Sequence, residues 1–179
     1  MKFTNWKLDK IEDILAEEFF YLIDRNLNHI TKTFPVTVSN CFDLEKTNEF
    51  ITNNIQIEKD KTGYYFYIRN LETNNLIGYI CIKKIDFNIS KCELAYFIDK
   101  DFEGKRIISK AVSDVIAICF KELSMNKIFI CTSKINFRSQ RIALKLGFIQ
   151  EGILREEFKN SEGILEDINY YGLLKSDYK

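Results

Sequence analysis

The spacing of hydrophobic residues changes near residue 60, and this change restricts the fold more than any other feature of the sequence. Before it, apolar residues recur at helical spacing in "KIEDILAEEFFYLIDRNLNHI" and, more weakly, in "FDLEKTNEFITNNI". After it come short aromatic and β-branched runs that are typical of strands, such as "TGYYFYIRN" and "KIFICTS". Pro35 lies between the helical stretches, and we expect "TKTFPVTVS" to be a loop because proline disfavours helix at Phe34.

The order of the predicted elements defines a fold class. Three antiparallel strands, of which the first two form a hairpin, precede a helix, a strand, a second helix and two closing strands. We therefore expect a mixed α/β (α+β) fold, with a mostly antiparallel central sheet and helices on both faces. A length of 179 residues favours one domain, with a helical segment at about 10–58 and a core at about 62–175.

Composition argues against several classes of function. The 26 basic and 26 acidic residues leave no overall field that would attract nucleic acid or an anionic membrane. No apolar run approaches the roughly 18 residues that a membrane helix needs. Five cysteines without a CxxC pair favour buried free thiols in a reducing cytoplasm, and the single histidine, His29, argues against zinc. We expect a cytoplasmic protein without a metal.

The stretch "FEGKRIISKA" places glycine and two cations between a predicted strand and a strongly apolar helix. The first N–H groups of a helix have no partner within the helix and attract anions, and a glycine lets a phosphate approach the backbone. We predict that the main-chain amides of this segment bind a diphosphate; the simpler alternative is an ordinary turn. The residues are Gly104, Lys105, Arg106, Ile107, Ile108 and Ser109.

The helix in "NFRSQRIALKLGF" carries signals at both ends. Asn136 is a good N-cap, and Gly147 can take the left-handed conformation just after the helix. The longer stretch "INFRSQRIALKLGFIQEGILRE" closely resembles the C-terminal signature of the GCN5-related N-acetyltransferase (GNAT) superfamily, in particular its Rim-type branch of ribosomal-protein N-acetyltransferases. The matching positions are Asn136, Ser139, Leu146, Gly147, Phe148, Glu151, Gly152, Leu154 and Arg155.

Two other stretches resemble the same family, so that the resemblance covers roughly Asp24 to Leu174. "CELAYFIDKDFEGKRIISKA" is similar to the strand, loop and helix that carry acetyl-CoA, and "RNLNHITKTFP" is similar to the acceptor-side helices. The resemblance implies a single acetyltransferase domain over 1–179, with an acceptor-side segment at about 10–58 and an acetyl-CoA-binding core at about 62–175. It also implies acetyl-CoA as cosubstrate, no metal and a homodimer as one form of assembly.

The resemblance also implies roles for individual residues. Backbone N–H groups near Phe97 and Ile98 would face the thioester oxygen. Asn136 would hold the pantetheine arm, and Ser139 would give a proton to the CoA sulfur. Glu93 could take the proton of the amine, although an ordinary salt bridge explains it equally well. His29, Phe34 and Glu157 would lie on the acceptor side, and Glu156 is an alternative to Glu157 as a catalytic carboxylate.

The implied reaction is direct transfer of an acetyl group to a primary amine in a ternary complex. The amine is that of a protein N-terminus or of a small molecule such as an antibiotic or a polyamine. Arg106 stands where the family has a second loop glycine. A positive φ there would cost a non-glycine residue about 1–2 kcal/mol, whereas a helical φ would avoid this cost. This departure leaves open a CoA-binding sensor or interaction module without catalysis.

Overall fold

The computed structural model describes residues 5–179, which contain seven strands and six α-helices. The strands are β1 (Trp6–Lys10), β2 (Tyr64–Asn70), β3 (Leu76–Asp86), β4 (Lys91–Ile98), β5 (Lys127–Ser133), β6 (Ile149–Lys159) and β7 (Leu165–Leu174). The helices are α1 (Ala16–Asp24), α2 (Leu27–Ile30), α3 (Pro35–Asn40), α4 (Leu44–Lys59), α5 (Ile107–Lys121) and α6 (Phe137–Lys145). Short 3-10 turns lie at Ile11–Asp13 and Lys100–Phe102.

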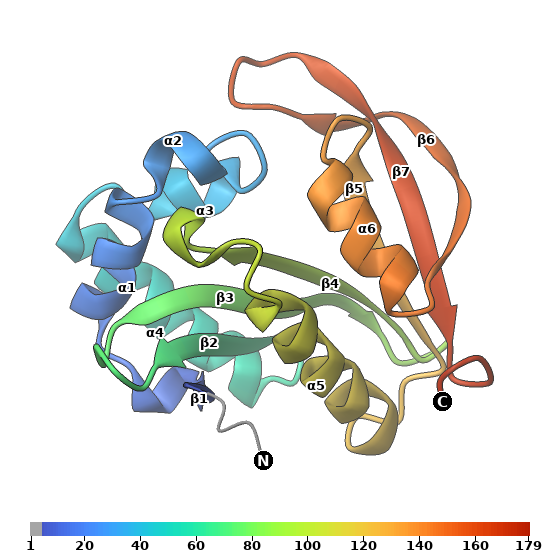
Figure 1. Cartoon of the computed structure of the whole chain (residues 1–179), viewed down its shortest axis with the longest axis horizontal. Coiled ribbons are helices and arrows are strands. Elements are labelled where there is room, and N and C mark those ends of the chain that lie inside the picture. Colours follow the sequence, from blue (N-terminus) through green and yellow to red (C-terminus); the bar gives the residue numbers. More distant parts are fainter. Residues whose placement is uncertain (1–4) are drawn as a thin grey trace. The chain divides into compact units, whose positions relative to one another are not determined.

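The strands form one sheet in the order β1-β2-β3-β4-β5-β7-β6 (Figure 1). The pairs β1·β2, β5·β7 and β6·β7 are antiparallel, whereas β4·β5 is parallel. The predicted mixed α/β class with a mostly antiparallel sheet is therefore confirmed.

The chain divides into two compact units. The first comprises residues up to 81 together with 96–111, and the second comprises 82–95 together with 112–179. The first unit takes β2 and the loop before α5 along with the N-terminal helices, and the expected segments at about 10–58 and 62–175 stay predictions. A single domain stays a prediction.

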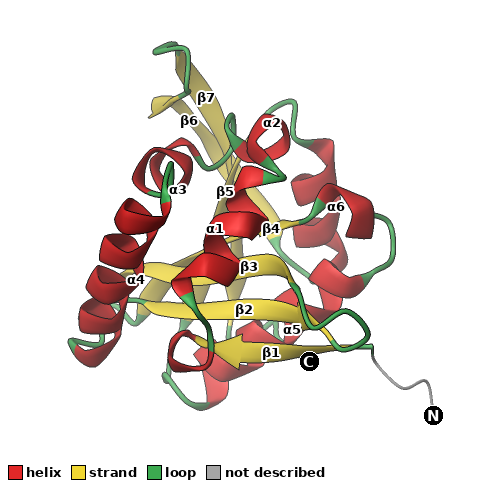
Figure 2. Ribbon diagram, turned by 90° about the vertical axis from the view of Figure 1, so that its left-hand side faces the viewer, coloured by secondary structure: helices red, strands yellow, loops and turns green. Residues whose placement is uncertain are grey.

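Aromatic rings build the core of the first unit. Phe19 of α1 meets Tyr67 of β2 edge-on at 5.2 Å and Tyr79 of β3 at 5.2 Å. Phe66 and Tyr67, which are neighbours in β2, are both buried. Because consecutive strand residues point to opposite faces, both faces of this strand are covered. Helix α4 packs against β2 and α1 on one of them (Figure 2).

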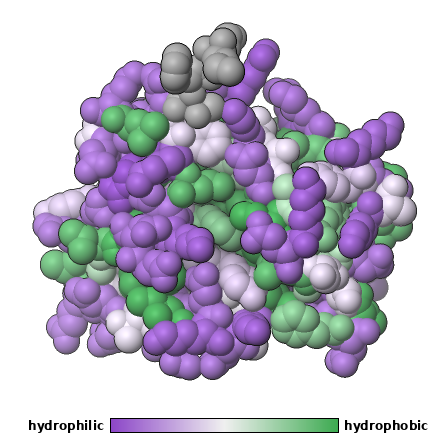
Figure 3. All heavy atoms as spheres, turned by 90° about the horizontal axis from the view of Figure 1, so that it is seen from below, coloured by the Kyte–Doolittle hydropathy of each residue, from purple (hydrophilic) through white to green (hydrophobic). Residues whose placement is uncertain are grey.

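The second unit packs α6 against β5 and β6, and the Phe129 and Tyr170 rings stack at 4.9 Å. Gly147 ends α6 with φ 88°, as predicted. All five cysteines are free thiols, and the expected burial is confirmed for four of them, whereas Cys131 is half-buried. Among the described residues, no helix has both the length and the apolar character to cross a membrane. Figure 3 shows a face of mostly hydrophilic side chains with hydrophobic ones interspersed.

Two expectations for the first third of the chain are wrong. The predicted helix from residue 10 is preceded by β1, whose Leu8 pairs with Ile68, and it is broken into a 3-10 turn, α1 and α2. The stretch around Pro35 contains helix α3 rather than only a loop. Phe34 is indeed non-helical, with φ −129°, but proline fits the first position of a helix because that N–H would have no partner within the helix.

Candidate active site

The segment before α5 has an unusual backbone. Gly104 has φ 72° and Arg106 has φ 63°, so both are left-handed, and α5 begins immediately afterwards at Ile107. Of the two alternatives for Arg106, a positive φ and a helical φ, the structure has the positive one. This conformation costs a residue with a Cβ about 1 kcal/mol. A conformation that is held against such a cost must be fixed by its surroundings.

Residues 104–109, the helix-start segment, present unused backbone donors. In the described chain, the N–H groups of this segment donate to no other protein group. A side chain at Gly104 would meet nothing within 4 Å, so the backbone there is open to a ligand. The Lys105 ammonium lies 4.5 Å from the Phe102 ring, and Arg106 is exposed. Free donors, a helix N-terminus and two cations together suit a diphosphate.

The other predicted residues of the first unit are His29, Phe34, Phe97 and Ile98. His29 Nε2 lies 3.2 Å from Glu103 Oε1, just before the segment. The Phe34 ring packs edge-on at 5.1 Å against the ring of Phe97, and Ile98 beside it is buried. Phe34 is thus a partly exposed residue at the edge of the aromatic core, and its contact with the acceptor stays a prediction. The role of the backbone N–H groups near Phe97 and Ile98 as donors to the thioester oxygen also stays a prediction.

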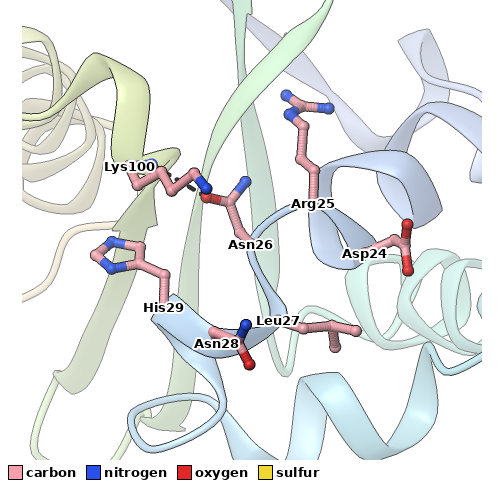
Figure 4. A pocket seen from close by; sticks show the side chains of 7 residues that line it. All are labelled: Asp24, Arg25, Asn26, Leu27, Asn28, His29 and Lys100. Atoms are coloured by element: carbon pink, nitrogen blue, oxygen red, sulfur yellow. Dashed lines mark hydrogen bonds between the residues drawn. The ribbon is translucent and has the colours of Figure 1, made fainter.

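An open pocket of about 360 Å³ lies at the α1–α2 turn of the first unit (Figure 4). Asn26 points towards Lys100, whose backbone N–H donates to the Asn26 side chain. The lining residues are Asp24, Arg25, Asn26, Leu27, Asn28, His29 and Lys100. His29 therefore borders a pocket, as the acceptor-side prediction requires, and is also paired with Glu103.

Asn136 and Ser139 come together at the start of α6 in the second unit. Asn136 Oδ1 accepts a hydrogen bond from the Ser139 backbone N–H at 3.2 Å, which confirms the predicted N-cap. Both side chains are half-buried. A helix cap fixes the rotamer of Asn136 and the first turn that carries Ser139, so both groups are held in defined positions.

Glu93 is buried, at 4% exposure, and two consecutive lysines reach it. Lys83 Nζ lies 3.3 Å from one carboxylate oxygen, and Lys84 Nζ lies 2.9 Å from the other. Neighbouring strand residues normally point to opposite faces, but the left-handed backbone of Lys84, φ 49°, breaks that alternation. Burial alone would lower the pKa of Lys84, yet the interaction with Glu93 outweighs it and raises that pKa. The salt-bridge alternative is thus observed, and the role of Glu93 as base stays a prediction.

A bulge in β6 sets the position of Glu157. The register moves from Leu154 opposite Ile168 to Phe158 opposite Glu166, so β6 holds two extra residues here. Glu156 takes φ 53° within the bulge. Glu157 itself is exposed, and its charge acts on Lys84 and on Cys131. Burial, followed by the charge of Glu93, raises the pKa of the Cys131 thiol to about 11. Glu157 therefore belongs to the same charged group as Glu93 and Lys84.

The parallel strands β4 and β5 pair only at their beginnings. Pairing runs from Lys91 opposite Lys127 to Glu93 opposite Phe129, and it does not extend to Leu94 or Ala95. The backbone of β4 beyond Glu93 is therefore not paired with β5.

The sequence reasoning missed two sets of residues. Arg25 and Asn26 anchor the chain at Asp99 and Lys100, and Lys83 and Lys84 bind Glu93. A signal for the second set was present in the sequence. Lys83 and Lys84 are adjacent at the end of a predicted strand, and the next predicted strand has one carboxylate, Glu93. No local pattern marks the first set, because its partners are about 70 residues apart.

An open helix start of this kind suits the diphosphate of a coenzyme A thioester. A model described as "Acetyltransferase (GNAT) domain" matches residues 4–149, which is most of the chain. The chain therefore belongs to the GNAT acetyltransferase family, as its sequence predicts, and is an N-acetyltransferase.

Individual relatives agree with this assignment. "Putative ribosomal N-acetyltransferase YdaF" of Bacillus subtilis (strain 168) is 35% identical over 109 residues, 61% of this chain and 59% of that protein. "Probable N-acetyltransferase YjcK" of the same organism is 29% identical over 164 residues, 90% of each chain.

Two solved structures share the fold. Ribosomal-protein-S5-alanine acetyltransferase from Vibrio fischeri gives a TM-score of 0.86 at 21% identity, covering 100% of this chain and 98% of that one. Microcin C7 self immunity acetyltransferase MccE, solved with acetyl-CoA and AMP, gives 0.79 at 22% identity over 89% and 86%.

Proposed function

We propose that this enzyme transfers the acetyl group of acetyl-CoA to the N-terminal amine of a protein, by direct attack within a ternary complex. The choice of acetyl-CoA as acetyl donor rests on the unused backbone N–H groups of residues 104–109, at the start of a 15-residue helix. These groups would hold the diphosphate of acetyl-CoA. The protein acceptor is supported by the names of the relatives, which include a ribosomal N-acetyltransferase and a ribosomal-protein-S5-alanine acetyltransferase.

The proposed reaction needs a neutral amine, a positioned thioester and a proton for the departing thiolate. The nitrogen–carbon bond forms as the carbon–sulfur bond breaks. Glu93 takes the proton of the amine, directly or through water, and Ser139 gives one to the CoA sulfur. A thiol with an ordinary pKa near about 8.5 needs only modest help to leave. Asn136, fixed by its cap hydrogen bond, holds the pantetheine arm.

The backbone near Phe97 and Ile98 supplies donors to the thioester oxygen, which is worth several kcal/mol when the donors are pre-positioned. His29, Phe34 and Glu157 form the acceptor side in this proposal. The pocket beside His29 supports that placement for the first of them.

A small amine is the second candidate acceptor, because a relative that is 23% identical over 89% of this chain is named spermidine N(1)-acetyltransferase. The third candidate function is a CoA-binding module without catalysis. It is considered because Arg106 has a left-handed backbone, which is unfavourable for arginine and which a glycine would adopt freely. A screen of N-terminal peptides, polyamines and antibiotics with acetyl-CoA distinguishes these candidates. Acetyl-CoA binding without transfer to any amine would favour the module.

Ser139→Ala tests the proposed mechanism. Turnover should fall by about 100-fold, as for loss of a general acid, while calorimetric affinity for acetyl-CoA changes little. Ser113→Ala on α5 is the matched control and should leave turnover unchanged. Equal turnover in Ser139→Ala and the parent would remove Ser139 from the mechanism. No heat of acetyl-CoA binding in the parent would overturn the donor proposal.

A further inference from the structure

In the first unit, three residues of the α1–α2 turn contact three residues that lie just before the helix-start segment. Residues 25, 26 and 29 contact residues 99, 100 and 103 respectively. The offsets are the same on both sides, so the turn follows residues 99–103, the anchor segment, along its length.

Each contact is a polar one of good length. Arg25 Nε donates to Asp99 Oδ2 at 2.6 Å. Asn26 Oδ1 accepts from the Lys100 backbone N–H at 3.0 Å, as Figure 4 shows. His29 Nε2 lies 3.2 Å from Glu103 Oε1. The last of these residues directly precedes Gly104, where the helix-start segment begins.

Two of the contacts have one buried partner each, which cannot easily rearrange. Asn26 is 1% exposed and Asp99 is 2% exposed. The Asn26 amide also donates to the Leu22 carbonyl at 2.9 Å, so turning it would leave buried polar groups without partners. Arg25 donates in addition to the Leu76 carbonyl of β3. The beginning of the anchor segment is thus fixed to both α1 and β3.

The helix-start segment itself lacks such support. Its backbone is left-handed at Gly104 and Arg106, and its N–H groups have no protein partners. A strained segment of this kind persists only when the chain on either side holds it. Helix α5 fixes one side, and the anchor segment fixes the other.

We propose that Arg25, Asn26 and His29 are positioning residues, which hold residues 99–103 so that the amides of residues 104–109 are arranged for the donor before it binds. This inference rests on the proposed binding of acetyl-CoA at residues 104–109. It assigns to His29 a second function beside the acceptor side, through its contact with Glu103.

The test uses Arg25→Met and His29→Gln in the full chain, because both side chains are partly exposed, and circular dichroism checks that each variant is folded. Hydrogen exchange in peptides covering residues 99–109 should accelerate in both variants without acetyl-CoA. The KM for acetyl-CoA should rise by about threefold to tenfold in both variants, which is the expected loss for one polar contact, while kcat at saturating donor stays within about twofold in Arg25→Met. Lys46→Gln breaks the exposed Lys46–Glu49 pair of the same unit and is the matched control.

A double-mutant cycle adds Glu103→Gln to His29→Gln. The two changes should be non-additive in the KM for acetyl-CoA, because they remove the same contact. Unchanged exchange at residues 99–109 together with an unchanged KM in folded Arg25→Met and His29→Gln would overturn the inference. A parent protein that fails to bind acetyl-CoA would instead overturn the proposed function, while the exchange measurement would still report on the contacts.

Discussion

Asp99 and Glu93 are two buried carboxylates at and just after one strand, and they are held in different ways. Asp99 accepts from the backbone N–H of Asp101 at 3.0 Å and from the guanidinium of Arg25 at 2.6 Å. Glu93 is held by the ammonium groups of Lys83 and Lys84, whose side chains are 45% and 61% exposed. Of the two Glu93 oxygens, Oε2 accepts no hydrogen bond of good geometry, although Lys84 Nζ lies 2.9 Å away.

The difference separates a carboxylate held in a fixed orientation from one held by mobile charges. Backbone donors and a planar guanidinium fix an orientation, whereas a lysine ammonium is a mobile point charge on a flexible stem. A carboxylate held by exposed ammonium groups can exchange one of them for an incoming amine. We therefore expect changes at Asp99 to affect folding and changes at Glu93 to affect turnover.

Asp99→Ala should have the largest effect on stability. It removes the partner of the Asp101 N–H and of Arg25, and we expect a loss of about 3 kcal/mol in the free energy of unfolding. Urea denaturation followed by circular dichroism measures it. Asp99→Asn keeps one acceptor oxygen and should lose less. A loss below about 0.5 kcal/mol in Asp99→Ala would show that Asp99 is not an anchor.

Glu93→Gln should lower kcat by about 100-fold, which is about 2.7 kcal/mol, if Glu93 accepts the proton of the amine. Its stability should change far less than that of Asp99→Ala, because the lysines can turn to water. Steady-state kinetics and calorimetry with acetyl-CoA check both statements. Lys83→Gln is the matched change on the other side of the ion pair. An unchanged kcat in Glu93→Gln would show that Glu93 is not the base and that its ion pairs are structural.

Acid should weaken the anchor. Burial alone would raise the pKa of Asp99, but the hydrogen bonds from the Asp101 backbone, Arg25 and Asn26 outweigh it and lower that pKa. The stabilisation is therefore complete above the ordinary aspartate value near about 4, and it is lost as the pH falls through the lower folded value. Urea denaturation between about pH 5 and pH 2 should show a steeper fall in the parent than in Asp99→Asn. The pKa of Glu18 is also lowered, chiefly by the hydrogen bond from Arg69, and this contribution is common to both proteins.

Arg106→Gly should have the smallest effect, a gain of about 0.5–1 kcal/mol in the free energy of unfolding, because glycine tolerates φ 63°. The affinity for acetyl-CoA should also change. Arg106→Ala removes the guanidinium but keeps the Cβ, so it separates charge from backbone strain. Thermal denaturation and calorimetry measure the two effects. Identical stability and affinity in the parent, Arg106→Gly and Arg106→Ala would show that neither the charge nor the backbone strain at Arg106 has an effect.

The sequence indicated most of the local structure correctly. The aromatic run of β2, the apolar helix α5 and the cap and glycine of α6 follow from neighbours in the chain, and so they were predicted within a few residues. β1 was missed because its sequence, "WKLDK", is charged and short, and it becomes a strand only through pairing with β2. Helix α3 was missed because proline permits a first helical turn as well as a loop.

By itself, the sequence determined the family, the order of elements from β2 onwards and the segment before α5 that presents free amides, because these depend on residues that are close in the chain. Only the tertiary structure decided the left-handed backbone of Arg106, the pairing of Glu93 with two adjacent lysines and the anchoring of residues 99–103 by the α1–α2 turn. Those contacts join residues about 10 to 74 positions apart. No local pattern encodes them, because their energy comes from burial and charge that exist only after the chain has folded.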